Sequence, residues 1–216
     1  MGRAFMIVFI ALLTGDATAG DAAESATTVQ EEEAEQSAWS FSASAYAYFV
    51  PDDDDYVQPT IIADHQWLHL EARYNYEDHD TVSLWGGYNF SCGEKVIFDA
   101  TPMLGVVSGD TRGFAPGYSL GLAWRWLELY SEGEYLFSTQ DEAESFFYSW
   151  STLTLSPVDW LQLGLVGQRT RVYESDLEIQ RGFLVGVSVH NVTMTAHMFN
   201  PDLDEPTYVI ALAVDW

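Results

Sequence analysis

The sequence predicts an all-β fold: a twelve-stranded antiparallel β-barrel with up-and-down topology, formed by residues 39–216. Three features predict it. Apolar and polar side chains alternate along a series of segments, which is the period-two pattern of strands with two unlike faces. Most of these segments have 9 or more residues, whereas strands of globular proteins average about 5–6. The connections alternate between short turns and longer acidic loops, as expected when both chain ends lie at the same end of an even-stranded barrel.

The first 38 residues lie outside this pattern. Residues 1–19 contain Arg3, an apolar run over 4–13 and the small residues Ala17, Thr18 and Ala19, which are the parts of a cleaved secretory signal peptide. The apolar run is shorter than the roughly 20 residues that a spanning helix needs. Residues 20–38 are rich in Ala, Thr and Glu. They predict an acidic, flexible leader, with a short helix that plugs the barrel as the alternative.

The segment 67–77 shows the alternation most clearly. Leu68 and Leu70 share one face, while His69, Glu71 and Arg73 share the other. A soluble core does not accept such a charged row without partners. A strand with one face toward lipid and one toward a lumen accounts for both rows, so the barrel is predicted to be transmembrane. The predicted strands are 39–50, 56–64, 67–77, 80–90, 95–108, 113–126, 128–138, 146–155, 160–172, 178–189, 192–200 and 207–216.

The lipid-facing side of strand 146–155 stays open. It is either the face of Phe146, Tyr148 and Trp150 or the face of Phe147, Leu153 and Leu155. Short connections are predicted at His65-Gln66, 91–94, near Leu127, at 156–159 and at His190-Asn191.

Aromatic side chains cluster near both predicted ends of the barrel, as in the two interfacial girdles of membrane proteins. Those at the short-turn end are Trp39, Trp67, Trp124, Trp126, Trp160 and Trp216, and those at the long-loop end are Phe49, Tyr56, Tyr76, Phe114, Phe137 and Tyr173. Core aromatics of a soluble barrel are the alternative interpretation.

The last strand has large apolar residues at every second position and ends on an aromatic residue. The residues of this pattern are Tyr208, Ile210, Leu212, Val214 and Trp216. In this the chain resembles the outer-membrane β-barrel proteins of Gram-negative bacteria, porin-like proteins among them. The resemblance implies recognition of this terminal signal by the barrel-assembly machinery, an outer-membrane location in contact with lipid and lipopolysaccharide, and a periplasmic position for the 20–38 leader. Because all the loops are short, we expect a monomer.

The polar face of each strand predicts the residues that line the lumen. They include Tyr46, Tyr48, Gln58 and Asp64, and the site prediction itself comprises Glu71, Arg73, Asn75, Asp99, Arg125, Glu128, Glu132, Glu134, Gln162, Gln168, Gln180, His197. Acidic residues outnumber arginines there, so an open lumen should favour neutral or cationic solutes. Alternatively, Arg73 and Arg125 pair with Glu71, Asp99 or Glu128 and close the lumen as a packed polar core.

The composition excludes several other functions. Lys and Arg total 8 against 33 Asp and Glu, a net charge of −25, which disfavours nucleic acid. The single Cys92 excludes an intramolecular disulfide.

His79, between acidic neighbours, is the best candidate for a hydrolase at the rim, but no hydrolase motif accompanies it, so we expect no enzyme and no cofactor. Weak binding of a divalent cation is possible at Asp52, Asp53, Asp54 and Asp55, although such runs are usually solvated loops.

The sequence therefore predicts a passive pore for small neutral or cationic solutes. The alternative is a closed barrel that serves as a structural or adhesion platform through its acidic loops.

Overall fold

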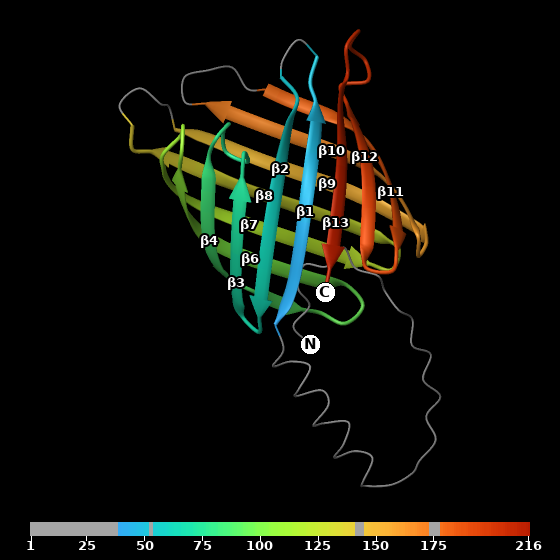
Figure 1. The fold of residues 1–216 in the computed structure, drawn as a ribbon. Helices are drawn as coiled ribbons and strands as arrows, with labels where there is room; N and C mark the ends of the chain where they lie inside the picture. The colour runs from blue at the N-terminus through green and yellow to red at the C-terminus, as the bar shows by residue number, and fades with distance from the viewer. Residues whose placement is uncertain (1–38, 52–53, 141–144, 173–177) are drawn as a thin grey trace, which may run out of the picture.

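The computed structural model describes residues 39–51, 54–140, 145–172 and 178–216. The predicted signal peptide and leader lie outside the described residues. The described chain forms a closed, twelve-stranded antiparallel β-barrel, which confirms the predicted fold class (Figure 1). No helix in this part of the chain is long and apolar enough to cross a membrane.

Each strand pairs with its neighbours in chain order, and β1 pairs with β13 to join the two ends of the chain. The pairing of β4 with β6 completes the ring, and the short β5 continues β4 along the same neighbour. The strands are β1 Ser40–Phe49, β2 Tyr56–His65, β3 Leu68–Tyr74, β4 Val82–Tyr88, β5 Phe90–Cys92, β6 Ile97–Ser108, β7 Gly113–Trp124, β8 Leu127–Ser138, β9 Phe146–Val158, β10 Leu161–Val172, β11 Glu178–Val189, β12 Val192–Phe199 and β13 Thr207–Asp215.

Two strand boundaries differ from the prediction by three residues, and the others agree with it to within two. β9 runs on to Val158, through the predicted turn at 156–159. The pairing with β10 shifts between Leu161 and Leu163, so two residues of β9 face one of β10 next to Pro157, which cannot donate a ladder hydrogen bond. β3 ends at Tyr74 rather than at 77, because Asn75 has a φ of 56° and turns the chain out of the strand.

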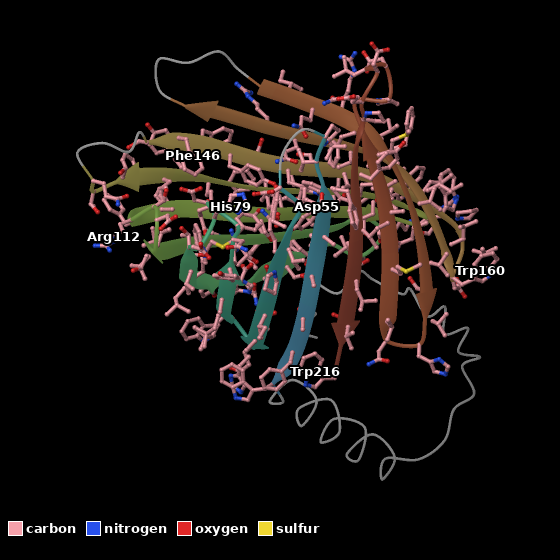
Figure 2. The ribbon with its side chains drawn as sticks, turned by 45° about the horizontal axis from the view of Figure 1, so that its top comes forward. Asp55, His79, Arg112, Phe146, Trp160 and Trp216 are labelled. Atoms are coloured by element: carbon pink, nitrogen blue, oxygen red, sulfur yellow. The ribbon has the colours of Figure 1, made fainter. Side chains whose placement is uncertain are left out.

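The two ends of the barrel differ. Three of the short connections turn at Gln66, Arg125 and His190, all with positive φ, and we call this end the turn end. The opposite end carries the longer connections and is called the loop end. β1 starts and β13 finishes side by side at the turn end (Figure 1). Figure 2 shows Trp216 near this end and His79 and Asp55 toward the other.

The outer face is apolar over most of its surface. Side chains such as Leu104 (68% exposed), Val106, Ile61, Phe183 and Met194 stand exposed along the middle of the strands. A water-soluble monomer rarely exposes a continuous apolar surface of this extent. The interior carries polar groups together with two apolar clusters.

The first cluster consists of Tyr48, Trp150, Val166, Leu184, Phe199 and Val209. The second consists of Trp85, Met103, Val107, Ala115 and Leu136. Since Trp150 is 6% exposed and Leu153 is exposed outside, β9 turns Tyr148 and Trp150 inward and its odd-numbered side chains outward. This resolves the choice left open for strand 146–155.

Candidate functional site: the acidic interior of the barrel

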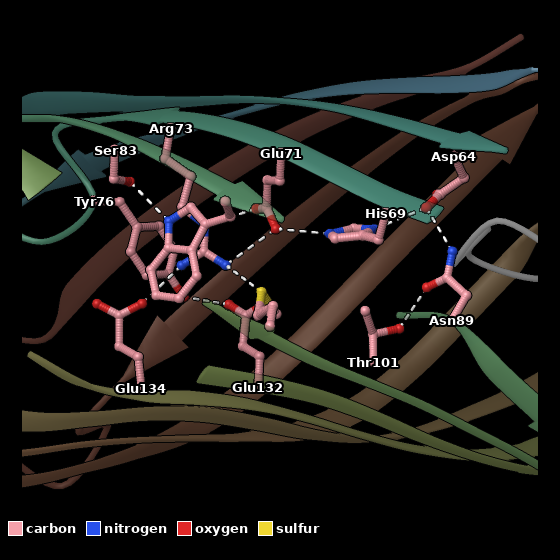
Figure 3. Close-up of polar contacts among 12 residues, drawn as sticks. Asp64, His69, Glu71, Arg73, Tyr76, Ser83, Asn89, Thr101, Glu132 and Glu134 are labelled. Atoms are coloured by element: carbon pink, nitrogen blue, oxygen red, sulfur yellow. Dashed lines mark hydrogen bonds and ion pairs between the residues drawn. The ribbon is translucent and has the colours of Figure 1, made fainter. Parts of the chain in front are cut away.

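A chain of hydrogen bonds runs through the interior along β2 and β3 (Figure 3). The ring of His69 lies between two carboxylates: Nδ1 is 2.8 Å from Asp64 Oδ1 and Nε2 is 3.2 Å from Glu71 Oε2. Asn89 donates from Nδ2 to Asp64 Oδ1 at 2.7 Å and accepts from Thr101 Oγ1 at 2.7 Å. The alternation of β3 positions His69, Glu71 and Arg73 on one face, so the sequence pattern itself aligns these groups.

Arg73 connects this chain to the far wall. Its Nε donates to Glu71 Oε1 at 2.7 Å, and its Nη1 donates to Glu134 Oε2 of β8 at 2.9 Å. The guanidinium also lies over the rings of Tyr76 and Trp85, with centroid distances of 4.2 and 4.5 Å. Arg73 is 4% exposed and Glu134 is 3% exposed. A buried charge needs several partners to offset its desolvation. The carboxylate partners of Arg73 come from β3 and β8, so the arginine links two walls of the barrel across its interior.

The β3–β4 connection folds inward at this point. After Asn75, which holds the loop by accepting the N–H of Asp80 and donating to Val57 O, the side chain of Tyr76 faces the interior. Tyr76 was predicted for the outer girdle, and that prediction is wrong because the turn at Asn75 reverses the alternation. Burial raises the pKa of the Glu77 carboxyl, while the nearby Arg73 guanidinium acts in the opposite direction.

A cavity of about 210 Å³ occupies the interior beside this network. Its lining reaches the turn end at Glu128, Gln162 and Asp215 and continues inward to Tyr48 and Tyr148. Toward the loop end, the interior is closed by buried side chains such as Phe199 and Val209, both 0% exposed. The described residues therefore enclose a cavity that reaches the turn end, with packed side chains between it and the loop end.

The cavity wall is acidic and aromatic. It carries the carboxyl groups of Glu71, Glu128, Glu132 and Asp215, and among the described residues that line it there is no lysine or arginine. Its aromatic residues are Tyr46, Tyr48, Tyr76, Tyr130, Tyr148 and Trp150. Arg73 pairs with Glu71 from outside the lining, and the remaining carboxyl groups, when ionised, create a negative potential that attracts positive solutes.

Glu132 is the centre of the hydrogen bonding in this wall. The hydroxyl of Tyr76 donates to Oε1 at 2.5 Å and that of Tyr130 donates to Oε2 at 2.6 Å. Each carboxylate oxygen thus accepts one phenolic O–H. The two phenols orient the carboxylate but do not neutralise its charge.

His197 of β12 also lines the cavity, between aromatic rings. Its ring lies 5.3 Å from that of Trp150 and 6.2 Å from that of Tyr46. The residue is 5% exposed, and its Nδ1 has no hydrogen-bond partner among the described residues. A buried polar atom of this kind costs stability and leaves hydrogen-bonding capacity at the cavity wall.

The structure places most of the predicted site residues inside the barrel. Glu71, Glu128, Glu132, Gln162 and His197 line the cavity, Arg73 and Glu134 form the cross-barrel ion pair, and Asp99, Gln168 and Gln180 are half-buried on the inward-facing positions of their strands. Tyr46, Tyr48 and Gln58 line the cavity too.

Two predicted lumen residues lie elsewhere. Asn75 belongs to the β3–β4 connection, and Arg125 is exposed in the β7–β8 turn beside the ring of Trp124. Both have positive φ, and the period-two pattern stops where a turn begins. Of the proposed partners for Arg73, the structure shows Glu71 and adds Glu134.

Several interior aromatic residues were not predicted from the sequence. Tyr130 shares the alternation of Glu128 and Glu132, so the pattern could have revealed it. Tyr56 was predicted for the girdle at the loop end, but its ring stacks on buried Tyr48 with centroids 4.6 Å apart. Trp85 carries no sequence signal of its role, because it packs against strands that lie farther along the chain.

The other aromatics of the predicted girdles lie on the outer face wherever they are described. The six tryptophans of the turn end, and Phe49, Phe114 and Phe137 at the loop end, are exposed, while Tyr173 lies outside the described residues. Trp216 and Tyr208 of the terminal pattern are also exposed, and Ile210 and Leu212 project to the same side. The pattern thus faces outward; its role as an assembly signal stays a prediction.

The predicted acidic metal loop is described only in part. Asp52 and Asp53 lie outside the described residues, and Asp55 Oδ1 accepts the N–H of Val50 at 3.3 Å. Among the described residues, no group of three or more His, Cys, Asp or Glu is arranged to hold a metal ion. The ring of His79 lies against that of Tyr56, with centroids 4.9 Å apart.

Comparison with known proteins supports the fold. Neither a protein-family model nor a curated protein matches the chain. Among solved structures, KdgM porin is similar, with a TM-score of 0.58 and 10% identity over 80% of this chain and 98% of that one. The chain has the fold of KdgM porin. The structure of KdgM porin in complex with disordered oligogalacturonate is similar as well, with a TM-score of 0.54 and 9% identity over 81% and 98% of the two chains.

Proposed function

We propose that this protein is a bacterial outer-membrane channel that passes small cationic or neutral solutes. The observation that carries the proposal is the contrast between the two faces of one closed barrel. Outside, exposed apolar side chains suit contact with acyl chains; inside, a cavity presents four carboxyl groups. A charged lining of one sign selects solutes of the opposite sign.

The solute differs from that of KdgM porin in this proposal. Oligogalacturonate, named with that protein, is a chain of sugar acids and carries negative charge. The cavity here has no described basic residue in its lining, so repulsion disfavours an anionic chain. The shared fold therefore serves as a scaffold, and the side chains set the selectivity.

One observation favours the closed platform as the second candidate. The buried side chains around Phe199 and the Arg73–Glu134 ion pair close the interior toward the loop end. In the pore proposal, these groups give a narrow, low-conductance path that opens by side-chain movement. In the platform proposal, the barrel never conducts.

Planar-bilayer recording tests the choice. We expect small conductance steps whose reversal potential in a KCl gradient reports preference for K⁺. Glu128→Gln, at the turn-end mouth of the cavity, should reduce that preference, whereas Asp204→Asn, which removes an exposed charge between β12 and β13, should leave it unchanged. Folded protein that inserts but stays silent would favour the platform, and preference for Cl⁻ would contradict the proposed selectivity.

A further inference from the structure

The cavity is more specialised than a water-filled passage requires. A passage for ions needs polar groups along its wall, and the wall here combines carboxyl groups with the faces and edges of aromatic rings. Tyr46 and Trp150 meet edge to face with centroids 6.0 Å apart, and Tyr76 and Tyr148 do the same at 5.4 Å. These two pairs join β1 to β9, and the β3–β4 connection to β9, across the interior.

We propose that this cavity is a binding site for a small organic cation, an alkylammonium ion such as choline. Aromatic rings attract an ammonium group through their negative faces, and aromatic cages bind quaternary ammonium ligands in this way. The carboxylate of Glu132 supplies the counter-charge, because its contacts are two neutral phenols and no described arginine or lysine pairs with it.

The neighbouring acids do not compete for this role. Glu71 is held at 2.7 Å by the guanidinium of Arg73 and approached by His69. Glu134 is held by Arg73 as well. Glu128 and Asp215 lie at the turn end of the cavity. Glu132 is therefore the carboxylate farther inside the cavity that no described arginine balances.

His197 adds a hydrogen-bonding group to the same wall. Its ring touches both Tyr46 and Trp150, and its buried Nδ1 has no partner among the described residues. A ligand that carries an O–H or N–H group beside its charge supplies a donor for this nitrogen. This feature favours choline over tetramethylammonium, which has no such donor.

The size of the cavity agrees with a ligand of this kind. A volume of about 210 Å³ holds several water molecules or one compact organic ion. The lining at Glu128, Gln162 and Asp215 reaches the turn end, so a ligand has access from that side. The inference deepens the proposed function and rests on it, since it names the class of solute that the channel admits.

Isothermal titration calorimetry on the refolded protein in detergent micelles tests the inference. Choline chloride is expected to bind, tetramethylammonium chloride to bind more weakly, and glucose and sodium acetate not to bind. Glu132→Gln removes the charge and keeps an oxygen acceptor for one of the two phenols, while its amide N–H can donate to the oxygen of the other, so it should weaken choline binding at least tenfold. Asp204→Asn removes the same charge at the exposed loop end and should bind choline as the unaltered protein does.

Several results would overturn the inference: no heat with choline, equal binding of glucose, or full affinity in Glu132→Gln. The reversal potential of the same preparation separates this failure from failure of the proposed function. If the protein prefers cations but does not bind choline, the binding site is disproved and the proposed channel function stands. If the protein binds choline but never conducts, the proposed channel function is disproved and the binding site belongs to a closed barrel.

Discussion

Arg73 is the residue on which the interior depends most. It is the described cation that faces Glu71 and Glu134, and its guanidinium also packs between the rings of Tyr76 and Trp85. Removal of one partner from a buried ion pair leaves uncompensated charge in a poorly solvated place, which costs far more than the loss of a surface pair. The structure offers both kinds of pair for comparison.

Arg73→Met should therefore lower the free energy of unfolding by about 3–5 kcal/mol, because it leaves two carboxylates without their counter-charge. The measurement is urea unfolding in lipid vesicles, followed by tryptophan fluorescence. Arg73→Met combined with Glu134→Gln should recover part of the loss.

Arg181→Met is the matched control. Arg181 pairs with Asp202 at 2.9 Å, but the two side chains are 74% and 57% exposed, so the loss should stay within about 1 kcal/mol. Equal losses in the two arginine variants would show that the Arg73 network does not stabilise the barrel.

At the scale of the element, the second apolar cluster depends on glycines in the strands that face Trp85. The indole donates to Ser83 Oγ at 2.9 Å and lies directly over the backbone of Gly105 in β6. A Cβ atom at Gly105 would meet the indole at 2.5 Å, closer than packed carbon atoms approach. β4, β6 and β7 thus pack together through one tryptophan and its glycine partners.

Gly105→Ala should displace this indole and lower the free energy of unfolding by about 1–3 kcal/mol, the usual cost of overpacking. Gly86→Ala in β4 is the control, since a Cβ atom there meets nothing within 4 Å. Its effect should stay below about 1 kcal/mol. Both are measured by the same unfolding assay, and an equal effect of the two substitutions would contradict the packing described for Trp85.

The elements themselves were largely predictable, because lipid outside and a polar lumen inside impose the same alternation on every strand. β11 spans the predicted 178–189. The pattern failed where backbone geometry intervenes: at Asn75, whose positive φ ends β3 and turns Tyr76 inward, and at Pro157, where a bulge lengthens β9. The alternation of apolar and polar residues does not predict the turn at Asn75 or the bulge at Pro157.

The site was predictable only as a list of inward-facing residues. Alternation identifies Glu71, Arg73 and Glu134 as interior, but their pairing joins residues 61 positions apart and depends on the curvature of the closed barrel. The cavity likewise depends on which rings meet across the interior, such as Tyr46 and Trp150. Sequence periodicity contains no information about those contacts.

At the scale of the whole molecule, the most informative feature is the outer surface. A band of exposed leucine, valine, isoleucine and phenylalanine surrounds a barrel whose outer tryptophans gather at the turn end. Because the barrel is closed, the backbone N–H and C=O groups along its strands pair with neighbouring strands, as a structure in hydrocarbon requires. The acidic loop residues, such as Asp202, Asp204 and Glu205, are exposed at the loop end, so charge and apolar surface occupy different zones.

The most direct test of the account is where the outer face lies in a reconstituted membrane. In a Cys92→Ser background, which removes the exposed native thiol, nitroxide labels are attached at single cysteines replacing Leu104, Val185, Met194 and, as the control, Asp204. Paramagnetic relaxation is then measured in lipid vesicles with molecular oxygen and with a water-soluble nickel chelate. The account predicts that the first three labels respond to oxygen and are shielded from the chelate, while the label at Asp204 responds to the chelate. Free access of the chelate to all four labels in folded protein would contradict it.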